Sequence, residues 1–140
     1  MTNLSRIKWE PAYSVHVEIL DAQHKKLFDT VNHLMDVFES GSADFLPAIN
    51  GLIEYISVHF HQEHLVMMNA KYPAFLSHSK EHQKFIEKVE GFIESYQAGD
   101  RDLGLNMVSY MKEWVRDHTT KLDMQYAEFL LKNAPPTRQP

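Results

Sequence analysis

Seven residues of this chain have the types and the spacing of metal ligands. They are five histidines and two carboxylates in four segments of helical periodicity: His24, His59, Glu63, His78, His82, His118 and Asp123. Two of the spacings, His59 to Glu63 and His78 to His82, are four residues, which places both members of each pair on one helix face. Seven such residues exceed what one zinc ion needs and suit a two-metal site inside a helical bundle.

The direction of each side chain on an ideal helix separates these residues from neighbouring histidines. At about 100° per residue, His59 and Glu63 share one apolar stripe. His61 lies about 160° away from Glu63. His64 lies about 140° away from His59, so it also leaves the stripe. We therefore expect His59 and Glu63 to face the core, and His61 and His64 to face elsewhere.

One spacing does not fit a regular helix. His118 and Asp123 are five residues apart, which corresponds to about 140° around an α-helix. That angle is poor for two ligands of one metal, although it is tolerable for ligands that approach two metals from their flanks. A π-bulge is one way to resolve the conflict, because such single-turn bulges occur frequently at functional sites.

The balance of nitrogen and oxygen donors narrows the chemistry. Imidazole suits Fe, Zn, Cu and Ni, and bridging carboxylates suit a pair of divalent ions. The chain has no Glu-x-x-His pair, which carboxylate di-iron oxidases use, and no His-Glu-x-x-His motif of zinc proteases. A set of five imidazoles and two carboxylates favours Fe(II) and argues against net oxidative chemistry.

The composition limits the class of protein. With 140 residues, 44% of them hydrophobic, the chain fits one globular domain with a real core. A net charge of −5 argues against nucleic acid or an anionic membrane as a partner. The absence of cysteine excludes disulfides, thiolate metal sites and cysteine nucleophiles. The chain has no signal-like start and no membrane-spanning apolar run, so we expect a cytoplasmic protein.

The elements that must position the seven residues follow from the apolar periodicity. It predicts four helices, over about residues 21–39, 44–69, 73–97 and 101–132, with Asp21 as the N-cap of the first. Short connections favour antiparallel neighbours, hence an all-α, up-down-up-down four-helix bundle. We expect three parts: an irregular N-terminal arm over 1–20, the bundle over 21–133 and a flexible tail over 134–140.

The motifs around these residues resemble the hemerythrin family, and in particular the single-domain bacteriohemerythrins. The resemblance spans Trp9 to about Leu130. It rests on five motifs: Trp-Glu-Pro-Ala-Tyr-Ser-Val (9–15) in the arm, Leu-Asp-Ala-Gln-His (20–24), His-Phe-His-Gln-Glu (59–63), Tyr-Pro (72–73) followed by His78 and His82, and Trp-Val-Arg-Asp-His (114–118) followed by Asp123 and Tyr126. Two residues depart from the family pattern. His64 stands where a second acidic residue is common, and Thr119 where an aliphatic residue is common.

The resemblance implies a non-haem di-iron centre that binds O2 reversibly and is not a turnover enzyme. One iron would be held by three imidazoles: His78, His82 and His118. The other would keep one open position, where O2 would bind end-on, and would be held by two: His24 and His59. An oxo or hydroxo group and two carboxylates would bridge the irons: Glu63 and Asp123. Spacing and resemblance together leave four histidines as non-ligands: His16, His33, His61 and His64.

Reversible O2 binding needs an apolar, water-poor pocket, because water and protons drive the loss of reduced oxygen. The candidates to line it are Leu27, Phe28, Phe60, Met67, Trp114 and Leu122. Ordinary core packing is the competing explanation for each. Two other functions stay open on the same scaffold: a di-iron oxidase, peroxidase or nitric-oxide-handling enzyme, and an iron-buffering module. An oxygen-using protein is the expected recipient for a storage or delivery role.

Overall fold

The computed structural model describes residues 4–41 and 44–133, and all regular structure within these ranges is helical. The long helices are α1 (Glu18–Glu39), α2 (Phe45–Asn69), α3 (Phe75–Gln97), α4 (Leu103–Asp117) and α5 (Asp123–Asn133). A π-helical turn, η2 (His118–Leu122), joins α4 to α5, and a 3-10 turn, η1 (Pro11–Tyr13), lies in the arm. The predicted all-α class is confirmed, and the expected tail over 134–140 lies outside the described residues.

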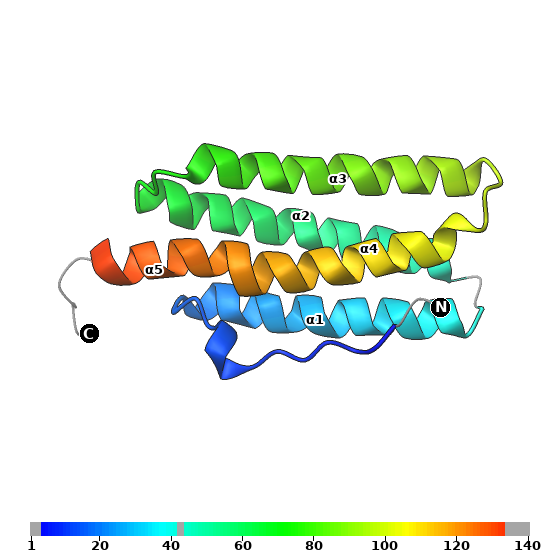
Figure 1. Cartoon of the computed structure of the whole chain (residues 1–140), viewed down its shortest axis with the longest axis horizontal. Coiled ribbons are helices and arrows are strands. Elements are labelled where there is room, and N and C mark those ends of the chain that lie inside the picture. Colours follow the sequence, from blue (N-terminus) through cyan, green and yellow to red (C-terminus); the bar gives the residue numbers. More distant parts are fainter. Residues whose placement is uncertain (1–3, 42–43, 134–140) are drawn as a thin grey trace.

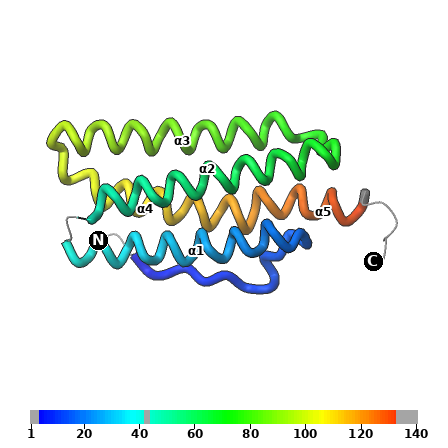
Figure 2. Tube along the Cα trace, turned by 180° about the vertical axis from the view of Figure 1, so that it is seen from behind, coloured from blue at the N-terminus to red at the C-terminus, as the bar shows by residue number. Residues whose placement is uncertain are grey.

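Four rods pack as an antiparallel bundle, because α4, η2 and α5 continue one another without a break (Figure 1). The α1 helix contacts α2 and α4, and α3 contacts α2 and α4. Seen from behind, the same rods lie side by side, with the arm alongside α1 (Figure 2). This arrangement is the predicted up-down-up-down topology. None of the described helices is long and apolar enough to span a membrane.

The arm is tied to α1 at both of its ends. Near its start, the Ile7 backbone exchanges two hydrogen bonds with the Asn32 side chain, of 2.9 and 2.8 Å. Near its end, the Asp21 carboxylate accepts a 2.8 Å hydrogen bond from the Val15 backbone N–H and a second bond from Ser14 Oγ. The prediction of Asp21 as a helix N-cap is therefore wrong. The helix begins three residues earlier, at Glu18, and Asp21 binds the arm instead.

The bundle core consists of two apolar clusters. The larger one includes Leu27, Phe60, Phe85 and Val115, and the smaller one consists of Val15, Leu20, Met67, Tyr126 and Ala127. Along the sequence of each rod, the predicted ligands are flanked on one side by a residue packed in or against the smaller cluster and on the other by a residue of the larger cluster. The fold thus places one buried polar layer between two apolar layers.

Candidate metal centre

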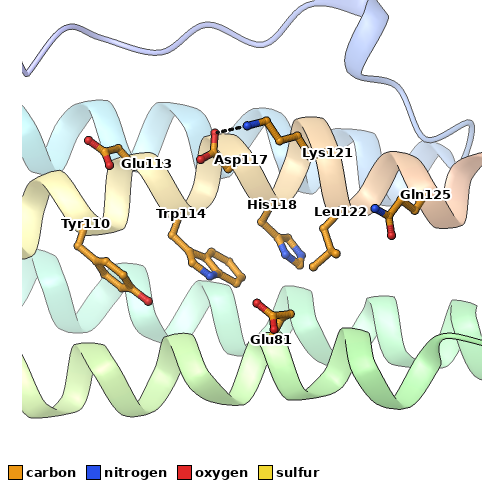
Figure 3. Close-up of a pocket in the computed structure, with 9 residues that line it drawn as sticks. All are labelled: Glu81, Tyr110, Glu113, Trp114, Asp117, His118, Lys121, Leu122 and Gln125. Atoms are coloured by element: carbon orange, nitrogen blue, oxygen red, sulfur yellow. Dashed lines mark ion pairs between the residues drawn. The ribbon is translucent and has the colours of Figure 1, made fainter.

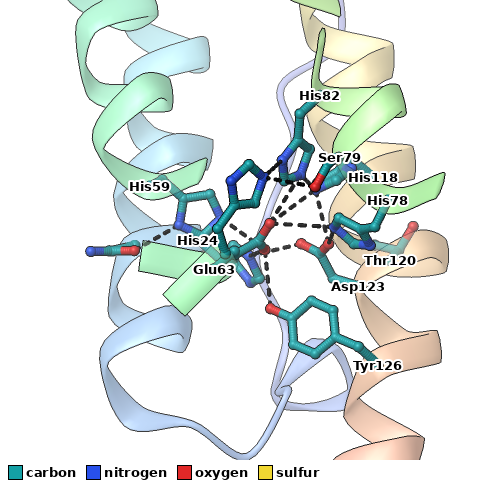
Figure 4. Close-up of polar contacts among 12 residues, drawn as sticks. His24, His59, Glu63, His78, Ser79, His82, His118, Thr120, Asp123 and Tyr126 are labelled. Atoms are coloured by element: carbon teal, nitrogen blue, oxygen red, sulfur yellow. Dashed lines mark hydrogen bonds and ion pairs between the residues drawn. The ribbon is translucent and has the colours of Figure 1, made fainter. Parts of the chain in front are cut away.

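All seven predicted residues converge in this polar layer, as Figure 4 shows. The α1 helix supplies one histidine, α2 a histidine and a glutamate, α3 two histidines, and the fourth rod a histidine and an aspartate: His24, His59, Glu63, His78, His82, His118 and Asp123. Their exposed fractions do not exceed 6%. Polar side chains buried this deeply require partners that compensate for lost water.

The π-helical turn η2 explains how His118 and Asp123 reach the same centre. The Asp123 backbone N–H donates to the His118 carbonyl, five residues earlier, where an α-helix would bond four residues apart. The wider turn holds one additional residue, so positions five apart come to one face. His118 Nε2 and Asp123 Oδ1 are 2.8 Å apart as a result. Of the two geometries that the sequence left open, the structure has the π-bulge.

The Glu63 carboxylate lies between two groups of imidazoles. Its Oε2 is 3.1 Å from Nε2 of His59 and 3.3 Å from Nε2 of His24, which we call the two-imidazole group. Its other oxygen, Oε1, faces the three-imidazole group at 3.1–3.4 Å from each Nε2: His78, His82 and His118. Each oxygen of one carboxylate therefore serves a different group.

Asp123 repeats this arrangement from the fourth rod. Its Oδ2 lies 2.9 Å from Nε2 of His24, in the two-imidazole group. Its Oδ1 lies 2.8 Å from Nε2 of His118 and 3.2 Å from Nε2 of His78, in the three-imidazole group. Each of the two carboxylates directs one oxygen to the two-imidazole group and the other oxygen to the three-imidazole group. This is the donor arrangement of a pair of bridged metal ions.

The unpaired atoms of the layer fit metal ions better than hydrogen bonds. Among the described residues, Nε2 of His59, Nε2 of His78 and both Asp123 oxygens are buried and have neighbours only at ion-pair distance, without a hydrogen bond of good geometry. Nε2 of His82 and Nε2 of His118 approach to 3.0 Å. Two ligand nitrogens at right angles around one ion, each about 2.1 Å from it, are about 3.0 Å apart. The donors thus fit two ions, one for each imidazole group.

Protonated imidazoles and ionised carboxylates in this layer compensate one another's charge. Burial lowers the pKa of His24, but hydrogen bonds to Asp123 and Glu63 outweigh it and raise that pKa to about 9. Burial likewise opposes the attraction of Asp123, which raises the pKa of His118 to about 10. At His82, burial and the neighbouring charges of His118 and His78 together lower the pKa to about 4. Ions entering this layer would replace protons on imidazole.

Comparisons with known proteins agree with this geometry. The hemerythrin HHE cation binding domain matches residues 15–130. The chain belongs to the hemerythrin family. Curated relatives include three proteins named bacteriohemerythrin, each 27% identical to this chain. They come from Methylococcus capsulatus (91% of this chain, 98% of the relative), Pseudomonas aeruginosa (89% and 82%) and Clostridium acetobutylicum (86% and 98%).

Two side chains to which sequence reasoning assigned no role contact predicted ligands of the layer. Gln23 Oε1 lies 2.7 Å from Nδ1 of His59, the ring nitrogen away from the carboxylates. The buried Tyr126 hydroxyl donates a 3.0 Å hydrogen bond to Oε2 of Glu63. Such contacts orient ligands and set their basicity. Both join different helices, so no periodicity within one helix could reveal them.

The histidines predicted as non-ligands fall into two kinds. Three are exposed: His16, His33 and His61. His64 is half-buried instead, and its Nε2 lies 3.1 Å from Nδ1 of His82. His64 lies outside both ligand groups, yet it touches a member of one. The helix-wheel argument placed it off the ligand stripe of α2 without revealing that α3 passes on that side.

The six candidates for an apolar pocket surround the layer unevenly. Four are buried: Leu27, Phe28, Phe60 and Met67. Phe60 stacks on His82 with ring centroids 3.6 Å apart, and Trp114 stacks on His118 at 4.3 Å. Trp114 and Leu122 are only half-buried and line a surface pocket of about 380 Å³ that also reaches His118 (Figure 3). The cover over the layer is therefore thinnest beside the three-imidazole group.

Proposed function

We propose that this chain binds O2 reversibly at a non-haem di-iron centre, for storage, delivery or sensing, without net turnover. The observation that supports it best is the position of the two carboxylates. Glu63 and Asp123 each direct one oxygen to the two-imidazole group and the other to the three-imidazole group. The proposed ligands are the seven residues of the layer. When bound, two iron ions with an oxo or hydroxo bridge would supply the electrons and the open position that O2 requires.

The residues of the chain would make that binding reversible by position and by exclusion of water. The two-imidazole group has fewer protein donors, which leaves room for a small ligand there. Its members, His24 and His59, have 0% exposed surface. Gln23 fixes the ring of His59, and Tyr126 holds the Glu63 oxygen that faces this group. The apolar clusters on both sides keep bulk water and protons away.

A spectrum taken through cycles of O2 exposure tests the proposal. The protein, reconstituted without air with Fe(II), should hold two iron ions per chain. We expect a visible absorption band to appear with O2, to disappear when O2 is removed and to return over repeated cycles. His61→Ala is the control, because His61 is exposed and lies outside the layer, and it should behave like the unchanged protein.

Other outcomes would identify the alternative functions. Loss of the band with one product formed in each cycle would indicate an oxidase, a peroxidase or another enzyme. Stable iron without any response to O2 would indicate an iron-buffering module. A single zinc ion per chain in the purified protein would contradict every iron-based function. The proposal also includes the cytoplasmic location and the oxygen-using recipient protein that the sequence led us to expect.

A further inference from the structure

His64 contacts a proposed ligand from the side that faces away from the centre. Its Nε2 lies 3.1 Å from Nδ1 of His82, and the two rings are nearly parallel, at 14°. The other ring nitrogen of His82, Nε2, points into the layer, 3.1 Å from Oε1 of Glu63. His82 therefore joins two different environments, the polar layer at Nε2 and a second imidazole at Nδ1.

The chemistry of imidazole determines which of the two rings donates. A neutral histidine that binds a metal through Nε2 carries its proton on Nδ1. Nδ1 of His82 then donates, and Nε2 of His64 accepts. Ser79 Oγ lies 3.4 Å from the same nitrogen of His64, a longer contact in which a hydroxyl can either donate or accept. The shorter contact, with His82, thus requires His64 to present an acceptor at Nε2.

The ring of His82 is held on two sides by contacts of different kinds. Phe60 stacks on it with an interplanar angle of 2°, which sets the plane of the ring. Stacking alone leaves the ring free to exchange the positions of its nitrogens. The hydrogen bond to His64 removes that freedom, because only one orientation points Nδ1–H at an acceptor. Phe75 meets the His64 ring edge-on and supports it in turn, with centroids 5.4 Å apart.

We propose that His64 is a positioning residue that fixes the orientation and tautomer of His82 and, as an uncharged acceptor, limits electron donation by His82 to its metal. This inference rests on the proposed di-iron function. A carboxylate at the same place would form a charge-assisted, stronger hydrogen bond and increase the basicity of His82. A more basic ligand stabilises the oxidised metal. His64 therefore favours the reduced centre that reversible O2 binding needs.

Metal affinity tests the positioning role. Removal of a partner of this kind typically weakens metal binding about 10- to 100-fold. We expect that loss for Zn²⁺ in His64→Leu, measured by chelator competition. His64→Gln should stay within a few-fold of the unchanged chain, because its Oε1 can accept where Nε2 does. His61→Leu, the same change at an exposed histidine three residues earlier on α2, should leave the affinity unchanged.

The reduction potential of the iron-loaded protein tests the electronic role. His64→Glu should keep the affinity but shift the one-electron equilibrium toward the oxidised form by roughly tenfold, which corresponds to about 59 mV. Its autoxidation in air should be faster by a similar factor. A purely structural role for His64 would leave the potential of a well-folded His64→Glu protein where it was.

Three results would overturn the inference. They are equal Zn²⁺ affinity in His64→Leu and His61→Leu, a loss in His64→Gln as large as in His64→Leu, and an unchanged potential in His64→Glu. Failure of the proposed function would look different. The unchanged chain and His61→Leu would then both lack the reversible O2 band, while the Zn²⁺ measurements would still decide the role of His64.

Discussion

The two imidazole groups of the centre are built differently. The three-imidazole group carries aromatic rings, with Phe60 stacked on His82 and Trp114 stacked on His118. It also borders the surface pocket, which reaches His118. The two-imidazole group, His24 and His59, has no exposed surface, and Gln23 Oε1 accepts a hydrogen bond from Nδ1 of His59.

In the proposed centre, this difference would separate two tasks that reversible O2 binding requires. The group with more donors lies nearer to water, where a metal without a vacant position is least vulnerable. The group with fewer donors lies deepest, where its two imidazoles are fully buried and bulk water is excluded. The proposed O2 site is therefore the group with fewer protein donors and the deeper burial. Variants that act on one group or on both test this difference.

The largest effect is expected from the carboxylates, because they serve both groups. Glu63→Ala or Asp123→Ala should abolish stable loading of two iron ions, since each change removes an oxygen from either group. Metal analysis after reconstitution with Fe(II) gives the stoichiometry. Glu81→Ala is the matched control, because Glu81 lies at the surface pocket and outside the layer. Two tightly held ions in Asp123→Ala would contradict the bridging role.

A smaller and unequal effect is expected when one imidazole is removed from either group. His59→Ala leaves a single imidazole in the two-imidazole group, so the chain should retain about one ion, because too few donors remain to hold a second. His78→Ala leaves two imidazoles in the other group, so it should retain both ions with weaker affinity. Metal content and chelator titration distinguish the two. Equal losses in both variants would show that the groups are equivalent.

A more local effect is expected from Gln23→Leu. This change removes the acceptor at Nδ1 of His59 and should weaken metal binding at the two-imidazole group about 10-fold, the lower end for such partners. Binding at the three-imidazole group should not change, so a two-step titration should move in one step only. Gln125→Leu, on the exposed surface of α5, provides the same substitution as a control. Weakening of both steps would contradict the separation into groups.

The smallest effect concerns the metal-free protein and its response to pH. The folded-state pKa values of His24 and His118, about 9 and about 10, lie above the free value of 6.5. Their contribution to stability is therefore complete below pH 6.5 and is lost as the pH rises through 9 to 10. We expect the Tm of the metal-free protein to fall by several degrees over this interval.

Loading with metal removes that dependence, because bound imidazoles carry no competing proton. Thermal unfolding of the loaded protein, followed by circular dichroism over the same interval, should show a flatter profile. At acid pH the loaded protein becomes the more pH-sensitive of the two, since protons then compete with metal for imidazole nitrogen. A loaded protein that loses stability between pH 6.5 and 10 as steeply as the metal-free one would count against metal binding at these histidines.

Much of the bundle could be predicted from the chain alone, because apolar periodicity and turn residues are local signals. The α2 helix begins at Phe45 and ends at Asn69, one residue from its predicted start and at its predicted end. The predicted start of α1 was wrong because the carboxylate of Asp21 can accept a hydrogen bond either from the first turn of a helix or from the chain that precedes it. The preference of Asp21 for the Val15 N–H depends on the path of the arm.

The sequence by itself determined the fold class, the seven candidate ligands and the conflict in spacing between His118 and Asp123. Each follows from residue types and from angles around one helix. The tertiary structure was needed to show which carboxylate oxygen faces which group, the contact of His64 with His82, and the depth of His24 and His59 relative to His118. These features are distances between side chains of different helices, which depend on how the rods pack and which no local pattern contains.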